Sequence, residues 1–220
     1  MARYLRILAP VLAAALTVLG IGVGQAAAAA PAASPTSGLT QYSDNYKVQF
    51  PYNLTQSDRF SVGGGPVYNA WVYKTDKPFK AGSSTGPRTE MRWVTTWSGV
   101  EHQWSADVLV DSGTEGACIM QVKGSTGGEA VYLDIHNNGD LYNSVDRTPI
   151  ATGLWGKWFH INADFNPANG TLRVWVNDKL VLTGHYDAPT TKKWYFKNGV
   201  YNTTGTKAEA HFRNITFWHA

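Results

Sequence analysis

The sequence contains few groups that could cross-link the chain: one cysteine, Cys118, occurs among 220 residues. A single cysteine excludes an intramolecular disulfide and a zinc site built from cysteines. Its neighbours Ala117 and Ile119 are apolar, and they predict a buried, unreactive thiol. A domain of this kind must be stabilised by its own packed core.

The chain also lacks an excess of charge of either sign. It has 19 Lys and Arg residues against 16 Asp and Glu residues, a formal net charge of +3. Two of the cations, Arg3 and Arg6, lie in an N-terminal segment that we expect to be removed. No acid lies there, so 19 less 2 leaves 17 cations against 16 acids. No long basic run is present, and we expect neither nucleic acid nor, after processing, a membrane as a partner.

The N-terminus has the organisation of a processed segment. Arg3 and Arg6 precede an apolar stretch from about residue 7 to residue 23, and an alanine run follows at residues 26–30. This pattern predicts a secretory signal peptide over residues 1–30, with a membrane anchor as the alternative. Residues 31–38 are rich in Pro, Ala and Ser and predict a flexible linker. We therefore expect an extracellular protein whose folded domain spans residues 39–220.

Helical patterns are almost absent, and no repeat of fixed period or second domain is present. Short β-rich runs alternate instead with Gly-, Asn- and Pro-rich turn signals, which predicts an all-β fold with two antiparallel sheets. The expected architecture is a concanavalin-like sandwich of these two sheets. The predicted strands are Ala70–Tyr73, Glu90–Thr95, His102–Val110, Cys118–Lys123, Ala130–His136, Trp158–Phe165, Leu172–Val176, Lys179–Leu182 and His211–Trp218.

Two local arrangements can be predicted within this series. Ala130–His136 and Leu141–Asn143, separated by an Asn/Gly-rich turn, predict a hairpin. A three-stranded meander is predicted over Trp158–Phe165, Leu172–Val176 and Lys179–Leu182. The first strand of the meander alternates apolar with polar residues, so one of its faces should lie in the core.

Polar residues recur at every second position in three segments, the first two of which overlap strands predicted above: Arg88–Arg92, Gln121–Lys123 and Tyr195–Asn202. In a strand this spacing places them on one face, and the apolar residues between them point into the core. Met91, Val122 and Phe196 are the expected core residues. The opposite face would carry arginines, lysines, an amide, a carboxylate and tyrosines. Such a face suits an acidic, hydroxyl-rich polymer.

These three segments resemble the alginate lyases of polysaccharide lyase family 7. That family carries the motifs R-[ST]-E-x-R, Q-[IV]-H and Y-F-K-A-G-x-Y-x-Q, which correspond in order and spacing to Arg88–Arg92, Gln121–Lys123 and Tyr195–Asn202. The resemblance covers the chain from about Tyr42 to its end. It implies a jelly roll with a concave substrate groove, and β-elimination on an acidic polysaccharide. We expect a monomer that needs no cofactor and no metal.

The resemblance also implies roles for individual residues. β-Elimination removes the proton at C5, stabilises the charge that develops on the neighbouring carboxylate, and protonates the leaving O4. By correspondence, Arg88 and Gln121 neutralise the carboxylate, and Tyr201 is catalytic. The residues expected to bind substrate are Arg92, His136, Tyr195 and Lys197. Glu90, also counted among them, lies between Arg88 and Arg92 and is expected to orient both arginines. A solvated ladder of charges is the alternative for Arg88, Glu90 and Arg92.

The sequence departs from the family pattern at Lys123, where the family has histidine. A lysine is protonated at neutral pH and is a poor base, so we expect Lys123 to bind the carboxylate. Tyr201 would then act as both base and acid, which requires the C5 proton and O4 to leave from the same side. Mannuronate and glucuronate linkages meet that requirement and guluronate linkages do not. His136 is the alternative base.

Two other functions are compatible with a secreted sandwich. A glycoside hydrolase would need two nearby carboxylates, usually on one strand, and no E-x-D-x-E pattern is present. A non-catalytic carbohydrate-binding module is the stronger alternative, because Lys123 could mark an inactive lyase scaffold. The expected function is a lyase acting on mannuronan, alginate or glucuronan.

Overall fold

The computed structural model describes residues 34–144 and 148–220. The predicted signal peptide and the first three residues of the predicted linker lie outside these ranges. Within them, no helical segment has the length and apolar character needed to cross a membrane.

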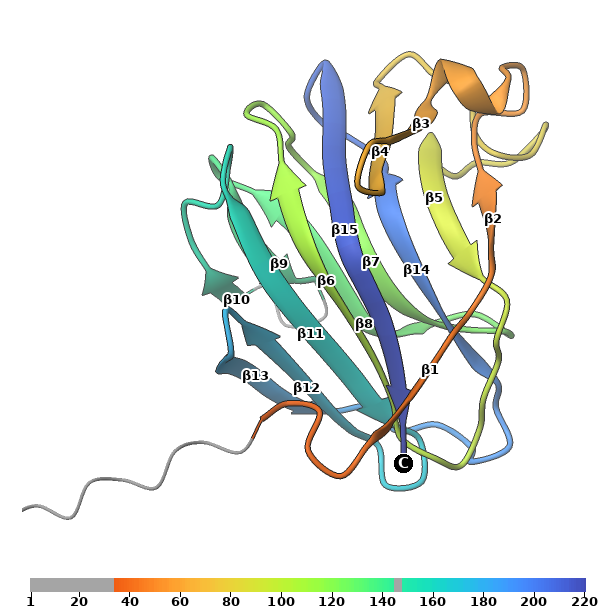
Figure 1. Ribbon diagram of the computed structural model, residues 1–220. Helices are drawn as coiled ribbons and strands as arrows, with labels where there is room; N and C mark the ends of the chain where they lie inside the picture. Colours follow the sequence, from red (N-terminus) through yellow and green to blue (C-terminus); the bar gives the residue numbers. More distant parts are fainter. Residues whose placement is uncertain (1–33, 145–147) are drawn as a thin grey trace, which may run out of the picture. The chain divides into compact units, whose positions relative to one another are not determined.

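In the described ranges the chain forms fifteen strands and one short 3-10 helix (Figure 1). The elements are β1 (Thr40–Tyr42), β2 (Tyr46–Gln49), η1 (Gln56–Asp58), β3 (Phe60–Gly63), β4 (Val67–Tyr73), β5 (Arg88–Trp93), β6 (His102–Val110), β7 (Ala117–Gly124), β8 (Glu129–His136), β9 (Asp140–Asn143), β10 (Thr148–Ala151), β11 (Trp158–Asn166), β12 (Thr171–Val176), β13 (Lys179–His185), β14 (Trp194–Tyr201) and β15 (Lys207–His219).

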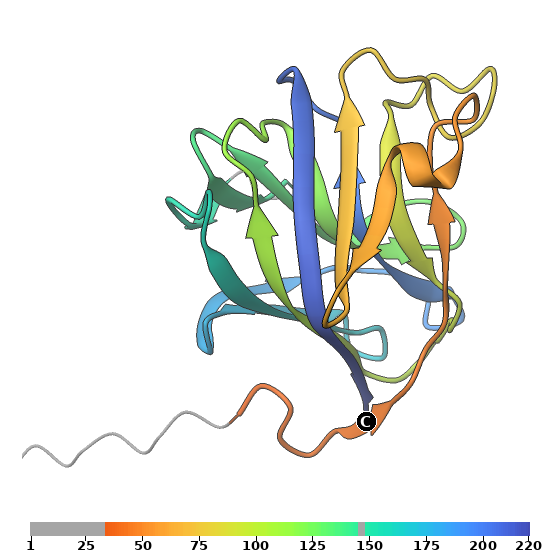
Figure 2. The same ribbon diagram turned by 45° about the horizontal axis from the view of Figure 1, so that its top comes forward.

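The strands make two antiparallel sheets that pack face to face as a jelly-roll sandwich. The first sheet has eight strands in the order β13-β12-β11-β6-β15-β4-β3, with β1 also pairing with β15. The second has seven strands in the order β10-β9-β8-β7-β14-β5-β2. Figure 2 shows β15 running along the nearer sheet, with strands of the other sheet behind it. The predicted all-β fold is confirmed.

The core lies between the sheets and is formed by alternate residues of each strand. Side chains at these positions are almost inaccessible to solvent, as the alternation predicts. They include Phe159, Ile161, Ala163 and Phe165 of β11, and Met91, Val122 and Phe196 of the seven-stranded sheet.

The predicted hairpin and meander are both confirmed by the register. β8 pairs with β9, and β11 pairs with β12, which pairs with β13. Four short strands, β1, β2, β3 and β10, were not predicted. They have three or four residues each, and their alternation is too short to distinguish them from loops. These short segments form strands because they pair with longer strands in the folded protein.

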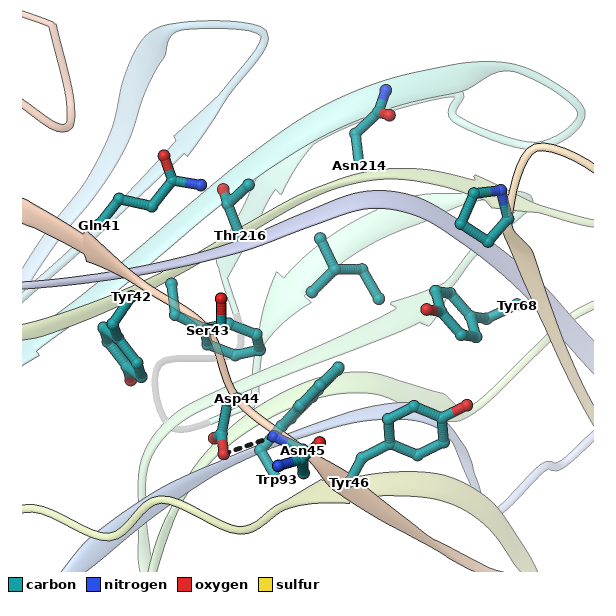
Figure 3. Close-up of a pocket in the computed structure, with 13 residues that line it drawn as sticks. Gln41, Tyr42, Ser43, Asp44, Asn45, Tyr46, Tyr68, Trp93, Asn214 and Thr216 are labelled. Carbon is teal, nitrogen blue, oxygen red and sulfur yellow. Dashed lines mark hydrogen bonds between the residues drawn. The ribbon is translucent and has the colours of Figure 1, made fainter.

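The chain crosses from the eight-stranded sheet to the seven-stranded sheet between β1 and β2. A cavity of about 520 Å³ opens beside this crossing, between Tyr46, Tyr68 and Trp93. Figure 3 shows Asp44 at the crossing, where its carboxylate accepts a hydrogen bond of 2.8 Å from the backbone N–H of Asn45. None of the residues predicted to form the site lines this cavity.

Two irregularities shape the seven-stranded sheet around β14. In β7 the register with β8 shifts between Cys118 and Met120, so that Ile119 and Met120 both point into the core. In β14, Gly199 has a φ of +145°. A Cβ there would lie 2.2 Å from the carbonyl oxygen of Thr89. Only glycine allows β5 and β14 to approach this closely.

We predict that Gly199→Ala lowers the free energy of unfolding by about 1–3 kcal/mol. The cause is the clash with Thr89 together with the positive φ. Gly64→Ala is the matched control, because a Cβ at Gly64 meets no atom within 4 Å. Urea unfolding of both variants measures the difference. Equal stabilities would show that the backbone near Thr89 adjusts freely.

His102 at the start of β6 is a buried imidazole. Its ring stacks on Trp97 with 4.6 Å between centroids, and its Nδ1 lies 3.1 Å from the hydroxyl of Tyr42. Burial, aided by nearby His219, lowers the pKa of His102 from 6.5 to about 4. The unfolded chain therefore binds more protons than the folded chain between these two values.

Stability linked to His102 is consequently present above about pH 6.5 and is lost as the pH falls towards 4. We predict that His102→Gln flattens the decline of the unfolding free energy with falling pH in this window. His185→Gln, at a half-exposed histidine, is the control for the loss of a surface imidazole. Denaturant unfolding at a series of pH values tests this, and equal slopes for the wild type and His102→Gln would contradict it.

Candidate active site

The register of three adjacent strands brings the predicted residues together on the outer face of the seven-stranded sheet. β14 lies between β5 and β7. Tyr201 of β14 pairs with Arg88 of β5. Lys197 pairs with Arg92 on one side and with Gln121 of β7 on the other. Because the intervening residues of each strand point into the core, these side chains share the outer face.

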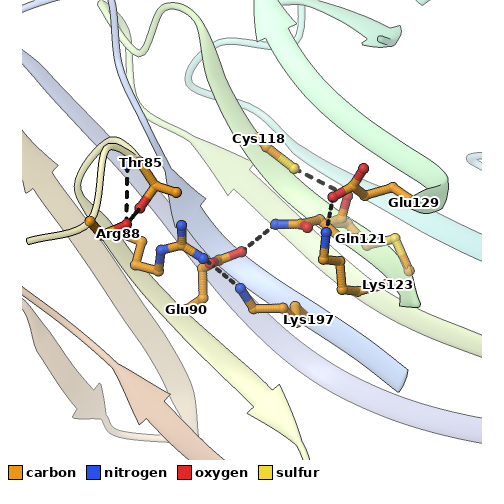
Figure 4. A network of polar contacts seen from close by, with 10 residues as sticks. Thr85, Arg88, Glu90, Cys118, Gln121, Lys123, Glu129 and Lys197 are labelled. Atoms are coloured by element: carbon orange, nitrogen blue, oxygen red, sulfur yellow. Dashed lines mark hydrogen bonds and ion pairs between the residues drawn. The ribbon is translucent and has the colours of Figure 1, made fainter. Parts of the chain in front are cut away.

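Glu90 is the centre of a polar network on this face (Figure 4). Its Oε1 accepts a hydrogen bond of 2.6 Å from Nε2 of Gln121, and its Oε2 forms an ion pair with Lys197. Nη1 of Arg88 lies 3.5 Å from the same Oε2. Glu90 pairs with Gly199 in the register. The missing side chain at Gly199 leaves room for Glu90 to reach across β14 to β7.

The network is shielded from solvent. Glu90 is 1% exposed, Gln121 2% and Lys197 3%. Burial lowers the pKa of Lys197, Glu90 opposes that shift, and the charge of Arg88 adds to it. A buried ammonium and a buried carboxylate are stable only as a pair, so each of these two residues requires the other.

Both arginines of β5 stack on tyrosines of β14. The guanidinium carbon of Arg88 lies 4.1 Å from the ring centroid of Tyr201, and that of Arg92 lies 4.3 Å from the ring centroid of Tyr195. Arg92 also donates to the carbonyl oxygen of Trp93 at 2.8 Å. Glu90 was expected to orient both arginines, but it contacts only Arg88.

Lys123 lies on the same face, opposite Tyr195 in the register. Its ammonium forms an ion pair with Glu129 at the start of β8, and both side chains are about one quarter exposed. The expected carboxylate binder therefore already has an anionic partner. Lys123 still lines a cavity of about 230 Å³ on this face, together with Arg88, Tyr195 and Lys197.

His136 lies further along the face, on β8. Its Nε2 is 2.6 Å from Oδ2 of Asp134, and its Nδ1 is 3.5 Å from Glu115. The ring lines a second cavity, of about 460 Å³. His136 is thus held between two carboxylates, and it belongs to a different cavity from Arg88 and Lys123.

Comparisons with known proteins identify the family of this chain. The family described as alginate lyase matches residues 41–219, which is most of the chain. The chain belongs to the alginate lyase family.

Solved structures of family members share its fold. An alginate lyase from Corynebacterium sp. superposes with a TM-score of 0.64 at 15% identity, over 80% of this chain and 94% of that one. The polysaccharide lyase family 7 enzyme AlgAT5 gives a TM-score of 0.63 at 20% identity, with the same coverage of 80% and 94%. An alginate lyase from Pseudomonas aeruginosa gives 0.61 at 16% identity, over 80% and 98%.

A curated relative with a different name has higher sequence identity. It is described as a citrate-binding protein from Hevea brasiliensis, and it is 35% identical over 194 residues, which cover 84% of this chain and 79% of the relative. A protein named for binding citrate is therefore among the relatives of this chain.

Four residues of the face were not among the predicted site residues: Cys118, Glu129, Tyr132 and Asp134. Cys118 is buried, as predicted, but it faces this site and not the apolar core. Burial raises the pKa of its thiol, and the charges of Glu90 and Asp134 raise it further. Burial likewise raises the pKa of Tyr132. The alternation of Tyr132, Asp134 and His136 in β8 was a usable signal for two of the four.

A group that could hold a metal lies elsewhere. Among the described residues, Asp111, Glu209 and His211 have ligand atoms within 4.8 Å of one another. They belong to the region of β6 and β15 in the eight-stranded sheet. Glu209 forms an ion pair with Lys207, and His211 bonds Asn69 at 2.7 Å. These contacts already satisfy the group in part, and it plays no part in the face described above.

We predict that Glu90→Gln and Lys197→Met each lower the free energy of unfolding by about 3–5 kcal/mol, because each leaves a buried charge unpaired. The double variant should lose less than the sum, since neither charge remains. Glu209→Gln is the control, at a more exposed ion pair expected to contribute less than about 1 kcal/mol. A double-mutant cycle in urea measures the coupling. Additive losses would contradict the pairing.

Proposed function

We propose that this protein is a secreted polysaccharide lyase that cleaves 1,4-linked uronate polymers by β-elimination. The observation that carries the proposal is the contact of Arg88 with the ring of Tyr201 at 4.1 Å, beside a basic cavity. This contact puts a carboxylate-binding cation next to an acid–base group. Family membership supports the same chemistry.

Arg88 is the proposed binder of the substrate carboxylate. Among the described residues, its side-chain nitrogens have one hydrogen-bond acceptor, Glu90, at 3.5 Å, and its Nε is unpaired. Its two Nη groups therefore keep donors for a bidentate contact with a uronate, whereas the unpaired Nε is buried. Gln121 gives one amide N–H to Glu90. Its second N–H can stabilise the charge that develops when the C5 proton leaves.

Tyr201 is the proposed base and acid. Its ionised oxygen removes the proton from C5, the C4–O4 bond breaks as the C4–C5 double bond forms, and the phenol returns the proton to O4. One group can perform both transfers only when C5–H and O4 lie on the same side of the ring. We therefore expect mannuronan or glucuronan to be cleaved, and guluronan to be a poor substrate.

The remaining residues of the face hold the substrate or its binders in place. Glu90 and Lys197 act as positioning residues, because their buried pair fixes Arg88 and Gln121. Arg92 and Lys123 extend the basic surface, and Tyr195 supports Arg92 through the stacking of its ring on the guanidinium. A serine mechanism is less well supported: Gly82–Gly86 fits the pattern G-x-S-x-G, but it lies in the loop before β5 and not in a strand-to-helix turn.

A second candidate is a binding protein without catalytic activity. The Hevea relative named as a citrate-binding protein favours it, as does the small basic cavity lined by Arg88, Lys123 and Lys197. In this case the cations would hold a compact polycarboxylate or a glycan carboxylate, and Tyr201 would transfer no proton.

We predict that the wild type, incubated with mannuronan or glucuronan, produces the ultraviolet absorbance of an unsaturated uronate. Tyr201→Phe should lower kcat by about 10²–10⁴-fold. It keeps the ring on which Arg88 stacks, so the fold should persist. Tyr52→Phe, at an exposed tyrosine, is the control.

Calorimetric titration with citrate separates the two candidates. If the wild type binds citrate and releases no unsaturated product from any uronan, the result would support the function of a binding protein. Full turnover by Tyr201→Phe would remove Tyr201 from the mechanism, and fastest turnover of guluronan would contradict its double role.

A further inference from the structure

A second cavity, of about 460 Å³, lies on the same face as the proposed site and has no role in the mechanism above. The cavity is lined by Gly116, Tyr132, Asp134, His136, Asn137, Tyr142, Ser144, Asn202 and Thr204. One wall is formed by the outward residues of β8, Tyr132, Asp134 and His136, which alternate with the core residues Val131, Leu133 and Ile135.

Tyr201 lies between this cavity and the basic one. Its ring is 4.1 Å from the guanidinium carbon of Arg88, which lines the basic cavity. On the other side it is 6.5 Å, between ring centroids, from Tyr132, which lines the second cavity. The sheet register gives the same order, because Arg88 pairs with Tyr201, Tyr201 with Cys118, and Cys118 with Asp134. A glycan cleaved at Tyr201 would therefore place one sugar on each side of it.

The two cavities differ in charge. The basic cavity is lined by Lys80, Arg88, Lys123 and Lys197. Among the described residues, none that lines the second cavity is an arginine or a lysine.

The second cavity instead holds a buried carboxylate. Asp134 is 5% exposed, and its Oδ2 accepts hydrogen bonds from Ser144 and His136. Its Oδ1 has no partner among the described residues. Glu115 lies 3.5 Å from the other nitrogen of His136. A uronate carboxylate placed here would lie beside the carboxylate of Asp134, with Glu115 behind the imidazole and outside the lining, so it would be repelled.

The lining is suited to a neutral sugar. The rings of Tyr132 and Tyr142 offer apolar surface of the kind on which sugar rings stack. Asn137 and Asn202 offer amide donors and acceptors, and Nδ2 of Asn137 already bonds the hydroxyl of Tyr142 at 2.6 Å. Several convergent polar groups around an aromatic wall are typical of a site for an uncharged, hydroxyl-rich ligand.

We propose that the second cavity is a subsite for a neutral sugar, and that the preferred substrate is an acidic polysaccharide in which a neutral sugar precedes the cleaved uronate. The proposal rests on the proposed function. The uronate lies at Arg88 and becomes the unsaturated end of one product. The neutral sugar lies between Tyr132 and Tyr142 and becomes the reducing end of the other.

Partial carboxyl reduction of the cleaved uronan gives a direct test, because it converts a random share of the uronate residues into neutral sugars on an unchanged backbone. Mass spectrometry of the products then identifies each new reducing end. We expect neutral sugars there in at least about fivefold excess over their share of the polymer. Reducing ends that follow the polymer's composition, or that are mostly uronate, would overturn the proposal. No unsaturated product from any polymer would instead contradict the lyase function.

A charge variant tests the cause of the preference. Asp134→Asn keeps an acceptor for Ser144 and His136 but removes the negative charge, so the roughly fivefold excess of neutral reducing ends should disappear. Asp187→Asn, at a carboxylate whose side chain is 95% exposed, is the matched control and should keep the preference. An unchanged preference in Asp134→Asn would show that this carboxylate does not select the sugar.

Binding to Tyr201→Phe separates recognition from turnover. A neutral 1,4-linked mannose trisaccharide should shift the NMR signals of Tyr132 and Tyr142, whereas the trimer of mannuronate should shift those of the residues around Arg88. This result would support the neutral subsite even if no polymer were cleaved. A mannuronate trimer that shifts the Tyr132 and Tyr142 signals more than the neutral trimer does would overturn it.

Discussion

The proposed site depends on the contacts that the carboxylate of Glu90 makes. It lies inside the protein at 1% exposure, yet it contacts groups from three strands: Arg88 on its own strand, Lys197 on β14 and Gln121 on β7. A buried carboxylate without these partners would be strongly unfavourable. The same contacts that stabilise it fix the directions of the cation and the amide proposed to bind substrate. Structural stability and the proposed chemistry thus depend on one network.

The backbone makes this network possible. Gly199 lies opposite Glu90 and leaves the space through which the carboxylate reaches β7, while the close approach of β5 and β14 permits no side chain there. The register shift in β7 then brings Cys118 and Gln121 to the same face although they are three residues apart. In a regular strand, that spacing would place them on opposite faces.

Period-two alternation made the fold and the shared face predictable from the sequence. Met91, Val122 and Phe196 point inward as expected, and the charged residues between them point outward. The partners of the charges were less predictable. Lys123 was expected to be free for a substrate carboxylate, and its pairing with Glu129 depends on β8 lying beside β7. Arg92 was expected to share Glu90 with Arg88, but it stacks on Tyr195 instead. Alternation in one strand shows which way a side chain points, and not which neighbouring strand supplies its partner.

The sequence also could not reveal that the face has two halves of different charge. The basic half comes from motifs on β5, β7 and β14, whereas the acidic and aromatic half comes from β8, β9 and the residues that follow β14. Each half alone is compatible with simple binding, and this chain has a relative named as a citrate-binding protein. The position of Tyr201 between the halves is what favours catalysis over binding.

The proposed site can be tested directly by a crystal structure of Tyr201→Phe soaked with a mannuronate trisaccharide. We expect one uronate carboxylate within about 3 Å of the guanidinium nitrogens of Arg88, with its C5–H directed at the ring of residue 201. A trisaccharide whose carboxylates all lie away from Arg88, or whose C5–H bonds all point away from residue 201, would contradict it.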